Sequence, residues 1–136
     1  MKTKLVLIFW LLILLNSCEL IKLTDHRRKK IDPNPKNSIG LVFLLIQEVK
    51  ENNIIGASKL FVGQDTSVNL EKVFELEDKL KRFGRNISKR EVTFYKVDTL
   101  NSTEHIVLIE FDYLIEYFFV AKKYSDYWFI RTFGEK

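Results

Sequence analysis

The sequence predicts a single α+β domain in which helices come first and consecutive antiparallel strands follow. The first observation is a change of period. Apolar residues recur every three or four positions up to about residue 83 and at every second position from residue 88 onward. The second observation is composition, because 46% hydrophobic and 29% charged residues in a chain of 136 are typical of one globular domain. Helices that precede such strands are expected to pack on one face of a curved antiparallel sheet.

Three helices are expected in the first half of the chain, at about 38–52, 54–62 and 69–83. The first is expected to begin at a cap, Asn37 or Ser38, and to stop at Asn52-Asn53. Its apolar residues form more than one stripe, which predicts a largely buried helix. Gly63 is expected to end the second helix. The third has a single apolar stripe, and Gly84 is expected to end it.

Four strands are expected in the second half, at about 92–98, 105–113, 118–124 and 127–133. Residues 99–104 are rich in turn formers, and Ser125-Asp126 predicts a tight turn. No Gly or Pro separates the second strand from the third, so one long bent strand over 105–124 is an alternative. Apolar and mostly charged residues alternate along 109–117, which predicts a half-buried sheet with one apolar face.

The N-terminus has the pattern of a bacterial signal peptide. Lys2 and Lys4 precede an apolar run at 5–15, which is too short to cross a bilayer, since that takes about 20 residues. The sequence Leu-Asn-Ser-Cys at 15–18 then resembles the lipobox of bacterial lipoproteins. This resemblance implies removal of residues 1–17 and acylation of Cys18, so we expect a protein held on a membrane by its lipid.

The resemblance to lipoproteins places the protein in the bacterial cell envelope. The chain is rich in Lys, Ile, Asn and Phe, a composition similar to that of Bacteroidota proteins. Residues 19–22 lack the acidic run that surface-exported lipoproteins of that phylum often carry, so an outer-membrane position facing the periplasm is expected. Residues 18–36 contain both prolines and predict a flexible tether before a domain at 37–136. The basic cluster 27–30 either draws the domain toward anionic headgroups or is simply solvated.

Several function classes are excluded by composition. The net charge of +4 falls to +2 when Lys2 and Lys4 are removed, which is too little to suggest nucleic-acid binding. One cysteine permits no internal disulfide, and with two histidines it cannot form a zinc site of the Cys₄ or Cys₂His₂ type. The five glycines are scattered and form no phosphate-binding loop. We therefore expect neither a metal nor another cofactor.

Four segments resemble the nuclear-transport-factor-two-like superfamily, and the resemblance covers about 37–134. They are Phe43–Glu51, Ala57–Phe61, Asp78–Gly84 and Tyr127–Ile130. The resemblance is one of pattern and has no diagnostic motif. It implies a cystatin-like cone, in which helices pack on one side of a curved sheet. An unrelated α+β layer is the alternative.

Some enzymes of that superfamily, such as ketosteroid isomerase, place a carboxylate base and a tyrosine inside the cone. In this chain Glu110 or Asp112, with Tyr113 or Tyr117, would supply that pair. The acids are expected on the face opposite the aromatic residues, however, and such a face is usually solvated. His105 has no catalytic motif around it and is expected at the rim of the sheet.

The first functional hypothesis is a lipid-anchored binding or accessory module of the envelope without catalytic activity. Its partner would be an envelope protein or a small ligand, bound by aromatic residues of the sheet. These candidates are Tyr113, Tyr117, Tyr127 and Trp128. The alternatives are a small envelope enzyme and a purely structural component, such as a homodimer formed through the open sheet. Asp98-Thr99-Leu100 also matches a short O-glycosylation pattern of Bacteroidota, with Thr99 as the acceptor.

Overall fold

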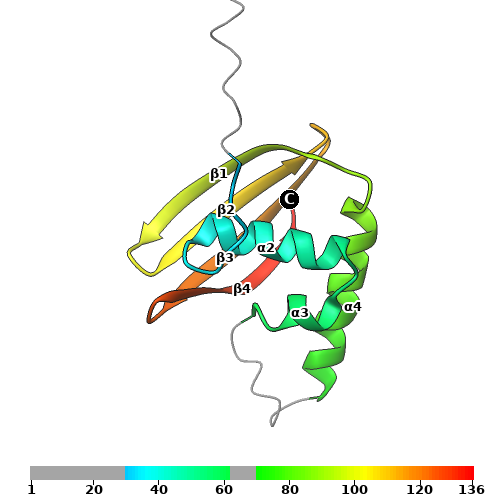
Figure 1. Cartoon of the computed structure of the whole chain (residues 1–136), viewed down its shortest axis with the longest axis horizontal. Coiled ribbons are helices and arrows are strands. Elements are labelled where there is room, and N and C mark those ends of the chain that lie inside the picture. The colour runs from blue at the N-terminus through cyan, green and yellow to red at the C-terminus, as the bar shows by residue number, and fades with distance from the viewer. Residues whose placement is uncertain (1–29, 62–69) are drawn as a thin grey trace, which may run out of the picture. The chain divides into compact units, whose positions relative to one another are not determined.

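The computed structural model describes residues 30–61 and 70–136, and these form the α+β domain that the sequence predicts (Figure 1). Within the described residues, three helices come first and four strands follow. The elements are α2 (Ser38–Lys50), α3 (Ile54–Ser58), α4 (Leu70–Ile87), β1 (Val92–Asn101), β2 (Glu104–Phe111), β3 (Ile115–Tyr124) and β4 (Tyr127–Glu135). The expected signal peptide, Cys18 and most of the expected tether lie outside the described residues.

Asparagine side chains begin α2 and α3. The Asn37 side chain accepts a hydrogen bond from the backbone N–H of Gly40 (2.7 Å), and that of Asn53 accepts one from Gly56 (3.1 Å). Asn52 has a positive φ of 58°, the left-handed conformation that commonly ends a helix. The cap of α2 is therefore Asn37, and the expected stop at Asn52-Asn53 is confirmed.

α4 continues about one turn beyond Gly84, where the sequence predicts its end. Gly84 is buried where α4 crosses the last turn of α2, and a Cβ there would lie 3.0 Å from the backbone oxygen of Val49. The prediction is wrong because this glycine permits a close helix contact instead of a left-handed cap. The second helix is shorter than predicted, because α3 ends at Ser58 and Phe61 forms a bridge with Ile130 of β4 instead of continuing the helix. Gly63, its expected stop, and residue 69, the expected start of the third helix, lie outside the described residues.

The strands form an antiparallel sheet in the order β1-β2-β3-β4. β1 extends to Asn101, so the turn predicted over 99–104 is shorter than expected. Residues 112–114 form a turn between β2 and β3, so the alternative of one long strand over 105–124 is wrong. Asp112 and Tyr113 both have positive φ there, 53° and 59°. Asp adopts this conformation more often than most residues, but tyrosine does not signal it in a sequence.

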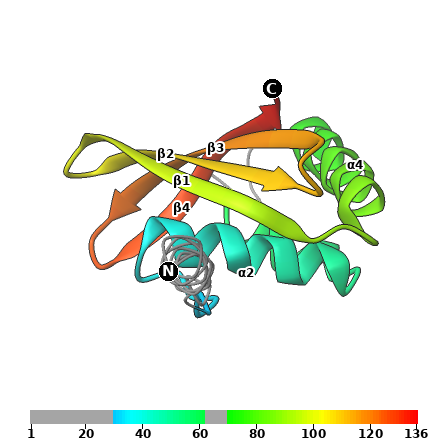
Figure 2. The same cartoon turned by 90° about the horizontal axis from the view of Figure 1, so that it is seen from above.

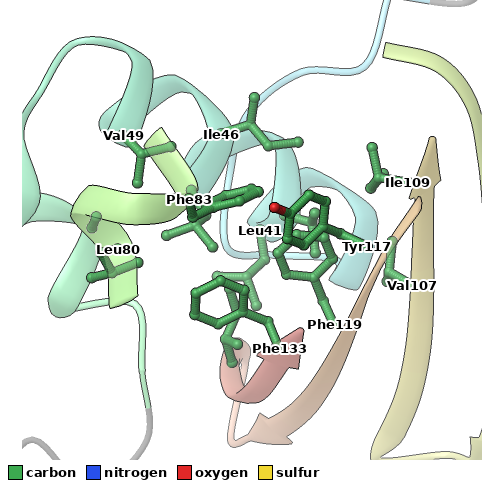
Figure 3. Packing of buried hydrophobic residues seen from close by; sticks show 14 of the residues in the cluster. Leu41, Ile46, Val49, Leu80, Phe83, Val107, Ile109, Tyr117, Phe119 and Phe133 are labelled. Atoms are coloured by element: carbon green, nitrogen blue, oxygen red, sulfur yellow. The ribbon is translucent and has the colours of Figure 1, made fainter. Parts of the chain in front are cut away.

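One face of the sheet packs against the helices and forms the hydrophobic core (Figure 3). Phe83 of α4 is at its centre. The Phe83 ring centroid lies 4.8 Å from that of Tyr117, 5.3 Å from that of Phe133 and 5.8 Å from that of Phe119. Leu41 of α2 is fully buried beside these rings. Tightly packed side chains therefore occupy the space between the helices and the sheet.

The chain before α2 and the chain after α3 are both hydrogen-bonded to β4, an edge strand. The backbone N–H of Trp128 donates to the carbonyl oxygen of Pro35 (2.8 Å), and that of Ile130 donates to Leu60 (2.8 Å). Phe61 also forms a parallel bridge with Ile130. These contacts cover part of an edge that would otherwise expose unpaired backbone groups. The compact unit accordingly begins at residue 31, within the segment assigned to the tether by the sequence.

Candidate functional site

The face of the sheet opposite the core carries six large apolar side chains. We call it the outer sheet face; it consists of Phe94, Ile106, Leu108, Phe118, Val120 and Phe129. In β2 and β3 buried residues alternate with partly exposed ones, and the cross-strand pairs Ile106–Val120 and Leu108–Phe118 lie at its centre. Phe94 of β1 is 54% exposed. Figure 2 shows α2 running along the other face of the twisted sheet.

Gly134 of β4 determines how the Phe118 ring lies on this face. A Cβ at Gly134 would be 3.0 Å from Cε1 and 3.2 Å from Cζ of Phe118, so the ring lies directly over the glycine backbone. An aromatic ring over a strand glycine covers backbone that has no side chain of its own. The Phe118 ring thereby extends the apolar surface from β3 over β4.

Charged side chains surround the outer sheet face and pair with one another. The three ion pairs are Lys96–Asp98 (2.8 Å), Arg131–Glu104 (3.4 Å) and Lys136–Glu116 (2.8 Å). Each pair contributes little to stability because it is largely solvent-exposed. Their effect is to give the rim equal numbers of positive and negative groups. An apolar centre within a polar rim is the usual anatomy of a protein–protein interface.

The four aromatic residues expected to bind a ligand do not form one surface. Tyr117 and Trp128 point into the core and are 4% and 6% exposed. Tyr113 lies in the turn after β2 and Tyr127 at the start of β4, and both are exposed. The expectation that Tyr113 and Tyr117 share a face is wrong because the turn at 112–114 interrupts the alternation.

The two carboxylates considered for catalysis are engaged with other groups. Glu110 accepts a hydrogen bond from the Thr93 hydroxyl (3.0 Å). The Asp112 carboxylate accepts one from the backbone N–H of Glu91 (2.9 Å) and pairs with Arg90 (3.2 Å). Both interactions hold the β2–β3 turn against the start of β1. Neither carboxylate is hydrogen-bonded to a tyrosine.

The carboxylate that meets a tyrosine is Glu135, which the sequence analysis missed. The Tyr117 hydroxyl donates to Glu135 (3.4 Å) and accepts from the Asn86 side chain (3.2 Å). Burial raises the pKa of Tyr117 above its usual value, and the Asn86 hydrogen bond opposes that shift. The Asn86 hydrogen bond therefore links β3 to α4, and the Glu135 contact links β3 to β4.

His105 forms a second polar cluster at the start of α2. Its Nδ1 lies 2.8 Å from the hydroxyl of Ser38, and its ring lies against Trp128 with centroids 4.2 Å apart. A serine beside a histidine is the pairing that activates a nucleophile. Ser38 is only 4% exposed, however, so a substrate does not reach its hydroxyl. The cluster is a structural contact between α2 and the sheet.

The remaining features are the candidate glycosylation residue, groups of metal-ligating side chains and membrane-spanning helices. Thr99, the candidate glycosylation residue, is exposed on β1. In residues 30–61 and 70–136, no three His, Cys, Asp or Glu side chains gather as metal ligands would, and no helix there is long and apolar enough to cross a membrane. No family model, curated protein or solved structure matches the chain. Function is therefore inferred from the geometry of this domain and from the sequence.

Proposed function

We propose that this chain is a lipid-anchored protein of the bacterial envelope that binds a protein partner through the outer sheet face. The observation that carries this proposal is the apolar centre of that face. Leu108 and Phe118 are only partly buried, although they lie in the two central strands of the sheet. Contiguous apolar surface of this kind is typical of sites of association.

The balanced rim favours a protein partner over a bilayer. Three of the six rim charges are carboxylates. Carboxylates at the edge of a docking surface would oppose contact with anionic headgroups, whereas mixed charges set register and specificity against a protein surface.

The alternative of a small enzyme, with a carboxylate and a tyrosine inside the cone, has less support. A general base must reach the proton that it abstracts. The predicted bases Glu110 and Asp112 hold the β2–β3 turn, and Tyr117 is packed among the rings of the core. The order of helices and strands is consistent with a cystatin-like cone, and we propose membership of the nuclear-transport-factor-two-like superfamily on that basis.

The lipid anchor would hold the domain close to the membrane. Twelve residues, 19–30, separate Cys18 from the compact unit at Ile31. Even fully extended, a stretch of this length spans at most about 45 Å. The anchor would thus keep the start of the compact unit, at Ile31, within about 45 Å of the bilayer.

Photo-crosslinking in the native cells tests the binding surface. A photoreactive amino acid replaces Leu108 on the outer sheet face. In a control chain it replaces Lys72, an exposed residue of α4. We expect one discrete adduct from position 108 that position 72 does not give, and a lower yield when Phe118→Arg is added. An adduct of two copies would favour the homodimer alternative. Equal adducts from both positions, or none from position 108, would overturn the assigned surface.

A further inference from the structure

A pocket of about 380 Å³ lies where the end of α2, the start of α3 and the C-terminal half of α4 meet. Figure 1 shows these three helices side by side, with α4 crossing the other two. The lining residues are Val49, Lys50, Asn52, Ile54, Lys81, Gly84, Arg85 and Ser88. The volume falls within the range of small-molecule sites, about 300–1,000 Å³.

The floor of the pocket is apolar and rigid. Val49 and Ile54 are 4% and 9% exposed, and Gly84 of α4 is buried against Val49. The close crossing at Gly84 places the backbones of α2 and α4 in contact, which creates a recess beside it. The Val49 carbonyl that lines this crossing accepts a hydrogen bond from Asn52 (3.2 Å). The recess is therefore a fixed part of the helix junction.

All charged residues that line the pocket are positive. Lys50, Lys81 and Arg85 are its three ionisable groups. Lys81 faces Glu77 only at 4.0 Å, and within the described part of the chain no carboxylate pairs with Arg85. The neighbouring Arg82 and Arg90 are paired with Asp78 and Asp112, so the positive field at the pocket comes from Lys50, Lys81 and Arg85. Such a site attracts anions.

We propose that this pocket binds a small amphipathic oxyanion, that is, a carboxylate or phosphate group carrying a short alkyl chain. The alkyl chain would contact Val49 and Ile54, and the oxyanion would meet Arg85 and Lys81 at the mouth. A guanidinium offers paired N–H donors that match either oxyanion. The Ser88 hydroxyl donates to the Arg85 carbonyl (3.1 Å), and it would have to leave that carbonyl in order to donate to the oxyanion. The site shares no residue with the outer sheet face and does not depend on the function proposed there.

Titration of the full chain in a neutral maltoside detergent tests this proposal. The ligands are hexyl phosphate, hexanoate, inorganic phosphate and hexanol, and the readout is the shift of the backbone amide signals of Asn52, Gly84 and Ser88. We expect saturable shifts with hexyl phosphate, with hexanoate or with both, and the tighter of the two identifies the headgroup. Inorganic phosphate and hexanol should each bind at least about tenfold more weakly, because each lacks one half of the recognised chemistry.

Two double variants separate this pocket from general surface charge. Lys81→Gln with Arg85→Gln should weaken binding at least about tenfold. The matched control, Lys72→Gln with Arg82→Gln, removes the same charge from the same helix outside the pocket and should change affinity less than about twofold. Equal losses in both variants, binding of hexanol as tight as that of the anions, or no saturable shift would each overturn the proposal.

Discussion

His105 lies between a serine hydroxyl and an indole ring at the junction of α2 with the sheet. Its cross-strand neighbours Thr99 and Ala121 are uncharged. Burial lowers the pKa of His105 from its usual 6.5, because the surroundings disfavour the imidazolium. The neutral ring can accept the Ser38 hydrogen bond at Nδ1, and protonation would remove that acceptor.

Folding stability should therefore depend on pH through His105. The unfolded chain binds this proton at a higher pH than the folded one does. The contribution of His105 is complete above about pH 6.5 and is lost as the pH falls through the lowered folded pKa. We expect the free energy of unfolding of wild type to exceed that of His105→Gln by more at about pH 7.5 than at about pH 5.5. Urea titrations at the two pH values measure this; an unchanged or larger difference in acid would contradict it.

At the scale of elements, the β2–β3 hairpin closes through a turn whose backbone conformation Tyr113 disfavours. The backbone N–H of Leu114 donates to the carbonyl of Phe111 (3.0 Å), while Asp112 and Tyr113 both take positive φ. A left-handed conformation costs an L-residue about 1–2 kcal/mol. Contacts with β1 hold the turn in place, because the N–H of Tyr113 donates to the Thr93 hydroxyl (3.0 Å). The Tyr113 ring is 73% exposed and adds little packing.

Replacing Tyr113 by glycine should stabilise the domain. Tyr113→Gly removes the clash of a Cβ at positive φ, and we expect the free energy of unfolding to rise by up to about 1 kcal/mol. Tyr113→Ala is the matched control, because it deletes the ring and retains the Cβ, and it should give no gain. Urea unfolding of both variants measures the difference. Destabilisation by glycine, or an equal gain from alanine, would show that the backbone is not strained at this turn.

A bulge in β4 explains why the Tyr117–Glu135 contact could not be predicted. The turn at Ser125-Asp126 was predicted correctly, and it pairs Tyr124 with Tyr127. Continuing that register without interruption would place Gly134 opposite Tyr117. The structure has a register shift between Val120 and Ala121, so that Tyr117 faces Glu135 instead. One extra residue in a strand leaves no periodic signal in sequence, yet it changes which side chains meet.

At the scale of the whole molecule, periodicity predicted the layer order and most of the strands correctly. It could not distinguish Gly84 at a helix crossing from a helix cap, because both positions require a residue without a Cβ. The candidate site was predicted less well. Tyr117 and Trp128 fill the core, and the apolar set Ile106, Leu108 and Val120 belongs to the outer sheet face. Alternation shows that a strand has two faces but does not reveal which one the helices will cover.

The location of the chain would determine which partners reach the outer sheet face and which anions reach the pocket between α2, α3 and α4. A lipid on Cys18 would confine both to the envelope and would set the partners and anions available to them. Without that anchor the domain would keep its core and both surfaces, because the contacts that form them all lie within residues 31–136.

The most direct test of this account is the intact mass and detergent partitioning of the chain expressed in a bacterial host, wild type beside Cys18→Ala. We expect wild type to lose residues 1–17, to gain the mass of fatty acyl chains and to partition into detergent. The substitution should abolish the added mass. An unmodified Cys18 in wild type, with the apolar segment retained or cleaved elsewhere, would contradict the anchored envelope protein proposed here.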